Sequence, residues 1–160
     1  ELFFPLMKFL AARAVTFNLR LFRIIADHIK GAVFISGEGV KPTNLGQGYV
    51  IRRLIRRILR YSRLVELAEK DCQKLAKETI NIYQEVYPAI REKEKEIFKI
   101  IEEEMAGFGA ALTKGTKEFE KLIQKRTVTS KEAFWLYETF GFPFELTKEL
   151  AEERGIKITF

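Results

Sequence analysis

The sequence contains few of the residues from which catalytic and metal sites are built. Its 160 residues include one cysteine, Cys72, and one histidine, His28. A single cysteine excludes an intramolecular disulfide framework and indicates a reducing compartment. Two such residues cannot supply the ligands of a structural zinc site, so we expect no metal site in this chain. The sequence also lacks a GxxxxGK[ST] phosphate loop and a GxGxxG dinucleotide motif.

His28 is the only residue on which triad-like catalysis could be based. It follows Asp27 in an apolar stretch with helical spacing, which favours a structural histidine over a general base. Carboxylates are frequent in the second half of the chain, but charge runs such as REKEKE and EEE are typical of solvated helix faces. We therefore predict no catalytic residue in this chain and expect it to be inactive alone.

Long apolar runs are missing as well. The apolar first 22 residues are interrupted by Lys8, Arg13 and Arg20, so no segment reaches the ~20 apolar residues of a membrane-spanning helix. We expect no membrane association and a cytoplasmic location. The sequence does not begin with Met, and we expect it to be part of a longer protein. Its 47% of apolar residues favours one folded domain, or one and a half small ones, over a disordered chain.

Charge is distributed unevenly along the chain. Residues 1–63 hold 12 Lys and Arg against 3 acidic residues, a net charge of +9. Residues 64–160 hold 16 against 19, a net charge of −3. A basic half joined to a mildly acidic half indicates a face that binds a polyanion.

Helical spacing of apolar residues dominates, and we predict an all-α fold with one or two short C-terminal strands. The predicted helices cover residues 9–34, 49–63, 64–86, 89–106 or beyond, 118–125, 130–140 and 145–154. A loop rich in Gly and Pro is expected at 37–48. Residues 156–160 are predicted to begin a strand whose partner lies outside this chain.

Residues typical of helix ends mark the boundaries of the C-terminal elements most clearly. Thr129 and Glu132 have the spacing of a capping box, and Gly141 with Pro143 ends the helix that the box begins. Three glycines weaken the helix prediction after residue 106; they are Gly107, Gly109 and Gly115.

Residues 49–63, YVIRRLIRRILRYSR, form the clearest amphipathic pattern. At about 100° per residue, the apolar side chains occupy one arc. The opposite arc holds Arg52, Arg53, Arg56, Arg57, Arg60 and Arg63. Guanidinium forks match phosphate geometry and keep their charge. These arginines favour nucleic acid, but a solvated helix partly neutralised by the acidic half, or an anionic membrane surface, also fits. The preceding loop adds Lys41, Thr43 and Asn44, although Asn44 is also a common turn residue.

Two long segments carry distinctive motifs: RIIADHIKGAVFISGEGVKPTNLGQGYVIRRLIRRILR and EAFWLYETFGFPFELTKELAEERGI. Together they resemble the central tRNA-recognition region of alanyl-tRNA synthetases. The opening ELFFPLM resembles the end of the preceding aminoacylation domain. Gln47 stands where the family usually has Arg, and Glu38 replaces the usual Asp.

The resemblance implies a fragment of an ATP-dependent class II alanine–tRNA ligase. It implies no cofactor in this chain, with ATP, magnesium and zinc bound only by parent domains outside it. Expected partners are the acceptor stem of tRNA(Ala) and the parent's catalytic and editing domains. The predicted divisions are a tail or first helix (1–22), a helical tRNA-recognition domain (23–106) and a C-terminal helical subdomain carrying GFPFELT (107–160).

By the same resemblance, Asn44 and Glu145 match the two residues that flank a G·U wobble pair in the acceptor stem. The wobble leaves the guanine amino group unpaired in the wide minor groove of A-form RNA, and an amide or a carboxylate can accept its hydrogen bond. Glu145 could equally be a first-turn carboxylate favoured by the helix dipole. Lys41, Thr43, Arg52, Arg53, Arg56, Arg57 and Arg60 are predicted to contact the RNA backbone. The alternatives are a generic helical binder of double-stranded nucleic acid and a structural helical domain.

Overall fold

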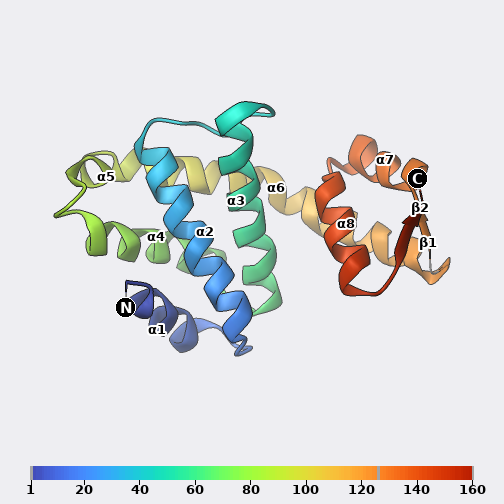
Figure 1. The fold of residues 1–160 in the computed structure, drawn as a ribbon, viewed down its shortest axis with the longest axis horizontal. Helices are drawn as coiled ribbons and strands as arrows, with labels where there is room; N and C mark the ends of the chain where they lie inside the picture. Colours follow the sequence, from blue (N-terminus) through green and yellow to red (C-terminus); the bar gives the residue numbers. More distant parts are fainter. Residues whose placement is uncertain (1, 126, 160) are drawn as a thin grey trace. The chain divides into compact units, whose positions relative to one another are not determined.

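A computed structural model describes residues 2–125 and 127–159 of the chain, and within that part the predicted all-α fold is confirmed (Figure 1). The elements are α1 (Phe4–Arg13), α2 (Leu19–Gly37), α3 (Gly46–Leu64), α4 (Glu69–Tyr83), α5 (Pro88–Glu92), α6 (Glu94–Leu122), a 3-10 turn η1 (Ile123–Lys125), β1 (Thr127–Thr129), α7 (Ser130–Phe140), α8 (Phe144–Glu153) and β2 (Lys157–Thr159). The chain divides into two compact units, Glu1–Ala106 and Gly107–Phe160, and α6 contributes residues to both.

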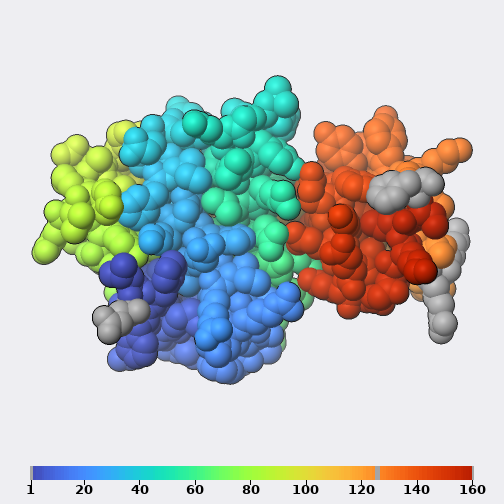
Figure 2. Space-filling view, in the orientation of Figure 1, coloured from blue at the N-terminus to red at the C-terminus, as the bar shows by residue number. Residues whose placement is uncertain are grey.

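The first unit is built around the contact between α2 and α3, with α1, α4 and α5 packed beside them. Figure 2 shows the side chains of α2 and α3 closely packed on the face in view. Both helices are amphipathic, and their apolar faces meet in a core of fully buried side chains that includes Phe22, Ile25, Ile29, Ile51 and Ile55. Burying such side chains stabilises the unit by about 1.5–3 kcal/mol each. This packing holds the arginine-rich helix α3 in place.

The prediction of one helix over residues 9–34 is wrong, because the chain breaks between α1 and α2. Asn18 caps α2 by accepting a hydrogen bond from the backbone N–H of Leu21 at 3.0 Å. The backbone N–H of Thr16 instead donates to the carbonyl of Val65 at 3.2 Å. A tertiary hydrogen bond and a favourable cap therefore replace the continuous helix that apolar spacing suggested.

The helix predicted over residues 64–86 is also interrupted, and α4 begins only at Glu69. Glu66 adopts the left-handed conformation, with φ of 53°, and the backbone N–H of Leu67 donates to the carbonyl of Ser62 at 2.8 Å. These contacts close a turn between α3 and α4. In contrast, α6 continues past Gly107, Gly109 and Gly115, which the sequence analysis had treated as helix-weakening positions.

Gly115 has a packing role in the second unit. A Cβ atom there would lie 2.0 Å from Cδ2 of Phe142, whose side chain is fully buried. The glycine therefore lets α6 approach the segment between α7 and α8 closely. The predicted capping box is confirmed, since Thr129 accepts from the backbone N–H of Glu132 and the Glu132 carboxylate accepts from that of Thr129. Gly141 ends α7 with φ of 66°, as predicted.

The C-terminal strand has its partner inside the chain, contrary to the prediction. β2 pairs in parallel with β1, with Val128 opposite Ile158. The intervening helices α7 and α8 make the crossover that a parallel pair requires. Phe160, the last residue of the predicted strand, lies outside the described residues. The sequence signal for β1 is only three residues long, so its pairing could not be foreseen.

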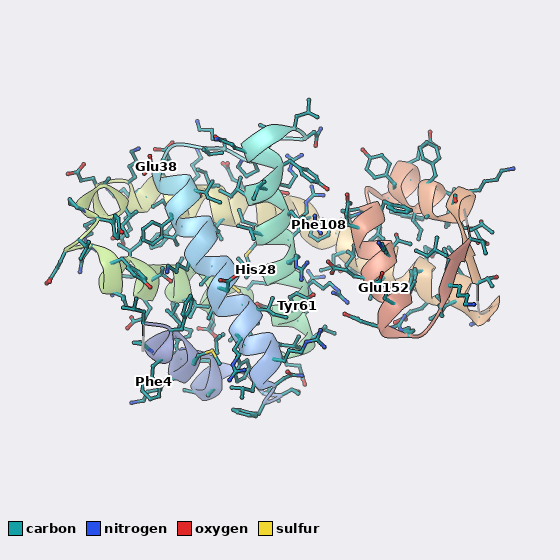
Figure 3. All side chains as sticks on the ribbon, viewed as in Figure 1. Phe4, His28, Glu38, Tyr61, Phe108 and Glu152 are labelled. Carbon is teal, nitrogen blue, oxygen red and sulfur yellow. The ribbon has the colours of Figure 1, made fainter. Side chains whose placement is uncertain are left out.

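The single histidine and the single cysteine both lie in the first unit. His28 lies midway along α2, with 15% of its side chain exposed and Nδ1 3.2 Å from Oδ2 of Asp27 (Figure 3). Cys72 is buried on α4, and its Sγ lies 3.4 Å from the hydroxyl of Ser62. Among the described residues no group of three or more His, Cys, Asp and Glu side chains could hold a metal ion. No described helix combines the length and apolar character needed to cross a membrane.

Replacing Gly115 with Ala should destabilise the chain by about 1–3 kcal/mol, because the added methyl group overpacks against the Phe142 ring. Gly107→Ala is the matched control in the same helix, since a Cβ there meets no atom within 4 Å. That change should stabilise the helix by about 0.5–1 kcal/mol. Urea unfolding followed by circular dichroism measures both. Equal effects of the two substitutions would contradict this packing role.

The Cys72 thiol should resist alkylation while the chain is folded. Burial raises the pKa of the Cys72 thiol to about 11, only partly offset by the hydrogen bond with Ser62. The thiol is therefore protonated at pH 8, and the thiolate is the reactive form. Iodoacetamide labelling followed by mass spectrometry should give a rate at least about tenfold lower in buffer than in 8 M urea at that pH. Fast labelling of the folded chain would show that the thiol is accessible.

Candidate nucleic-acid interface

The loop before α3 is folded back onto the first turn of that helix. The backbone N–H of Thr43 donates to the carbonyl of Gly48 at 3.0 Å, and its hydroxyl donates to the carbonyl of Leu45 at 2.8 Å. A Cβ at Gly48 would lie 2.1 Å from Oγ1 of Thr43 and 2.5 Å from the carbonyl oxygen of Lys41. The absence of a side chain at Gly48 thus permits the close approach that orders residues 41–45.

Asn44 is an exposed residue of this ordered loop, two positions before α3 begins. Nη1 of Arg52 donates a hydrogen bond to Oδ1 of Asn44. Because only the amide oxygen can accept from a guanidinium, this contact defines which way the amide faces. Two predicted site residues, Asn44 and Arg52, are thereby brought together although eight positions separate them.

Arg52 and its neighbour one turn later share a carboxylate from α6. Nε of Arg56 donates to Oε1 of Glu104 at 2.7 Å, and Nε of Arg52 lies 3.3 Å from the same oxygen in an ion pair without hydrogen-bond geometry. Only 10% of the Glu104 side chain is exposed, against 23% and 26% for the two arginines. The arrangement forms a chain of polar contacts from α6 through α3 to Asn44 in the loop.

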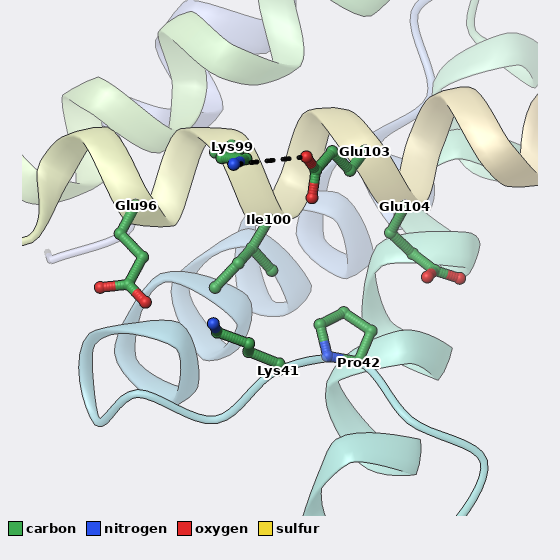
Figure 4. A pocket seen from close by; sticks show the side chains of 7 residues that line it. All are labelled: Lys41, Pro42, Glu96, Lys99, Ile100, Glu103 and Glu104. Atoms are coloured by element: carbon green, nitrogen blue, oxygen red, sulfur yellow. Dashed lines mark ion pairs between the residues drawn. The ribbon is translucent and has the colours of Figure 1, made fainter.

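A hollow of about 400 Å³ lies between the loop and α6 (Figure 4). Lys41 and Pro42 line it from the loop side, and five residues of α6 face them: Glu96, Lys99, Ile100, Glu103 and Glu104. Lys99 and Glu103 pair with each other at 3.8 Å across one turn. The loop therefore stands away from α6 at Lys41 and Pro42.

The remaining arginines of α3 have different surroundings. Arg53 is exposed and has no hydrogen-bond or ion-pair partner among the described residues. Nη2 of Arg57 donates to the Tyr61 hydroxyl at 3.2 Å, and Arg63 pairs with Glu69 at 3.1 Å. Lys41, in the loop before α3, is also exposed.

Arg60 differs from the other arginines of α3 because it is buried. Only 5% of Arg60 is exposed, and its guanidinium carbon lies 5.0 Å from the ring centroid of Tyr61. The helical period gives the direction of a side chain but not what packs on that side. Its burial disfavours a phosphate contact from solvent, and the predicted contact of Arg60 with the RNA backbone stays a prediction.

Glu145 belongs to the second unit, where it lies in the first turn of α8 and is half-buried. Pro143 is the N-cap and has an extended backbone conformation, so the helix begins sharply after the GFP sequence. A carboxylate in a first turn is favoured by the helix dipole. The predicted role of Glu145 as a reader stays a prediction.

Glu104 is the residue of this site that sequence reasoning missed, because the run Glu102–Glu104 resembles a solvated face. The signal lies in the spacing of Ile97, Ile101 and Phe108, which are buried on α6. Glu104 falls between them in the same stripe at i+3 and i+4 spacing. A carboxylate within a buried stripe requires a cationic partner, and the arginine-rich helix supplies it.

Comparison with known proteins agrees with the resemblance found in the motifs. The chain is 40% identical over 139 residues to an alanine–tRNA ligase of Prochlorococcus marinus, which covers 86% of this chain and 16% of the relative. It is 41% identical to the alanine–tRNA ligase of Elusimicrobium minutum, over 85% of this chain and 16% of the relative. The ligase of Treponema pallidum is 42% identical, over 85% and 24% respectively.

The chain thus spans between about a sixth and a quarter of the length of these curated relatives. A family model described as class II tRNA synthetases (A) matches residues 2–160. Since this match covers almost every residue, the chain belongs to the family of class II tRNA synthetases (A).

Proposed function

We propose that this chain binds the acceptor stem of tRNA(Ala) and reads its G·U wobble pair on behalf of an alanine–tRNA ligase in the cytoplasm. The observation that carries the proposal is the exposed Asn44 amide, held in one orientation at the start of an arginine-rich helix. Activation of alanine with ATP and magnesium, and any zinc-dependent editing, would take place in other parts of the parent enzyme.

Phosphate contacts would provide most of the affinity, and base contacts the specificity. Arg53 and Lys41 are exposed cations on the helix and on the loop, and they are the side chains best placed for phosphates. Arg56 and Arg52 contribute positive potential, but each lies against Glu104. The expected salt dependence is therefore smaller than six free arginines would give.

Base reading would be performed by Asn44, whose amide suits the unpaired guanine amino group of a G·U pair. The amide oxygen has two acceptor sites and the NH2 group two donors. The hydrogen bond from Arg52 occupies one acceptor site and leaves the other available. In a G·C pair the amino group is engaged with cytosine, so the same contact is weaker.

Glu145 is proposed as the second reader of the G·U pair. A carboxylate accepts but cannot donate, which suits the amino group of guanine. Its position in the first turn of α8, directly after the FPF segment, supports a fixed orientation of the carboxylate.

A structural helical domain is the second candidate, and one observation favours it. Three arginines of α3 already pair with carboxylates of the chain, since Arg52 and Arg56 contact Glu104 and Arg63 contacts Glu69. Such a domain would bind RNA weakly or not at all, with little dependence on salt. The salt series described next separates the two candidates.

Arg53→Ala should weaken binding of an acceptor-stem duplex equally for G·U and G·C sequences. One lost phosphate contact reduces the slope of log K against log salt by roughly 1. Filter binding between 50 and 300 mM KCl measures the slope. Lys70→Ala, which removes the same charge from an exposed position on α4, should change the slope by much less. A loss of G·U preference in Arg53→Ala would identify Arg53 as a base reader and contradict this assignment.

Asn44→Ala should reduce the preference for G·U over G·C stems by about 1–3 kcal/mol, as expected for one good base contact. Its salt slope should remain that of the unchanged chain, because no charge is lost. The matched control is Asn81→Ala, another exposed amide in the first unit, which should leave the preference intact. If Asn44→Ala weakened both stems alike, Asn44 would be a loop-stabilising residue and the proposed reading would fail.

A further inference from the structure

The orientation of Asn44 depends on a side chain that the motif alone does not single out. Asn44 is exposed on a loop, and its amide is attached through two rotatable bonds, so an isolated side chain would sample several orientations. Base discrimination requires the acceptor oxygen to be directed consistently. The donor that directs it is Nη1 of Arg52.

Arg52 is itself held from the opposite side. Its Nε lies 3.3 Å from Oε1 of Glu104, and that carboxylate is 10% exposed. The planar guanidinium presents donors along two edges, so one edge can meet Glu104 while the other meets Asn44. A lysine has a single point charge on a flexible stem and cannot span both partners.

Arg52 thus links the Asn44 side chain to Glu104 of α6 through polar contacts. The hollow beneath Lys41 and Pro42 separates the loop from α6 at those residues. Hydrogen bonds of Thr43 with Leu45 and Gly48 hold the loop backbone on α3, but they do not involve the Asn44 amide. Within the described part of the chain, Arg52 is the residue that donates a hydrogen bond to the Asn44 amide oxygen.

We infer that Arg52, anchored by Glu104, is a positioning residue that orients the Asn44 amide for G·U recognition. This inference rests on the proposed function and reassigns Arg52 from the set expected to contact the RNA backbone. Glu104 acts through Arg52 and touches no base. Arg56, which donates to the same oxygen of Glu104 at 2.7 Å, helps to hold the carboxylate in place.

The test compares Arg52→Lys with Arg23→Lys, at an exposed arginine of α2, in the full chain, using acceptor-stem duplexes that differ only in G·U or G·C. Both substitutions keep the charge, so the salt slope should stay the same in each. Arg52→Lys should lower the G·U preference at least about fivefold. The loss should not exceed the one expected for Asn44→Ala. Arg23→Lys should keep the preference. Adding Asn44→Ala to Arg52→Lys should cause no further loss, because both changes affect one contact.

A second pair of variants tests the anchor and guards against a misfolded Arg52→Lys chain. Glu104→Gln keeps the shape of the side chain but removes its charge, and should lower the G·U preference without weakening overall binding. Glu103→Gln removes the same charge from an adjacent side chain that is 67% exposed, and should keep the preference. Thermal unfolding by circular dichroism verifies that each variant is folded.

The outcomes distinguish the two proposals. If the unchanged chain shows no G·U preference, or Asn44→Ala retains it, the proposed function is wrong and the positioning role is overturned with it. If Asn44→Ala abolishes the preference while folded Arg52→Lys and Glu104→Gln both keep it, reading by Asn44 stands and the positioning role is overturned. A change of salt slope in Arg52→Lys alone, with the preference kept, would return Arg52 to the phosphate contacts.

Discussion

A single carboxylate from α6 lies between two guanidinium groups of α3, and the arrangement of the candidate site depends on it. Arg52 and Arg56 are one helical turn apart, so without a counter-charge their guanidinium groups would repel each other. Glu104 compensates both through one oxygen, at 3.3 and 2.7 Å. Removing one member of a nearly buried set of this kind leaves an uncompensated charge and is far more costly than losing an exposed ion pair.

This constraint divides the arginine-rich helix into parts with different chemistry. Arg53 faces solvent, Arg52 and Arg56 are tied to α6, and Arg60 is buried beside Tyr61. The arginines of α3 therefore do not form one uniformly exposed cationic face. Fewer of their charges face solvent, and the others form an inner row held by contacts within the chain. In the proposed positioning role, this inner row directs the Asn44 amide through the hydrogen bond from Arg52.

The second unit obtains its form from a different constraint, the close approach of α6 to the segment that follows α7. The absence of a side chain at Gly115 leaves room for the fully buried Phe142 ring, and β1 before α7 pairs in parallel with β2 after α8. The capping box at Thr129 and the left-handed Gly141 begin and end α7, so α8 starts at a defined point. These local signals determine that Glu145 lies in the first turn of α8.

Features that depend on neighbours in sequence were determined by the sequence itself. The amphipathic α3, the capping box, the end of α7 at Gly141 and the helix over residues 144–153 follow from periodicity, caps and turn residues, which act within a few positions. The motifs that contain Asn44 and Glu145 were equally visible in the sequence. The family assignment followed from those motifs and the later comparisons agreed with it.

Only the tertiary structure decided what depends on residues far apart in the chain. The break before α2 involves Thr16 and Val65, the burial of Arg60 contradicts its helical period, and β2 finds a three-residue partner about thirty positions earlier. The link from Glu104 through Arg52 to Asn44 joins α6 to the loop before α3 across roughly fifty residues. A helical pattern predicts the direction in which a side chain points. The group that the side chain contacts there depends on how the helices pack. Charge compensation and close approach are properties of the folded arrangement and not of local sequence.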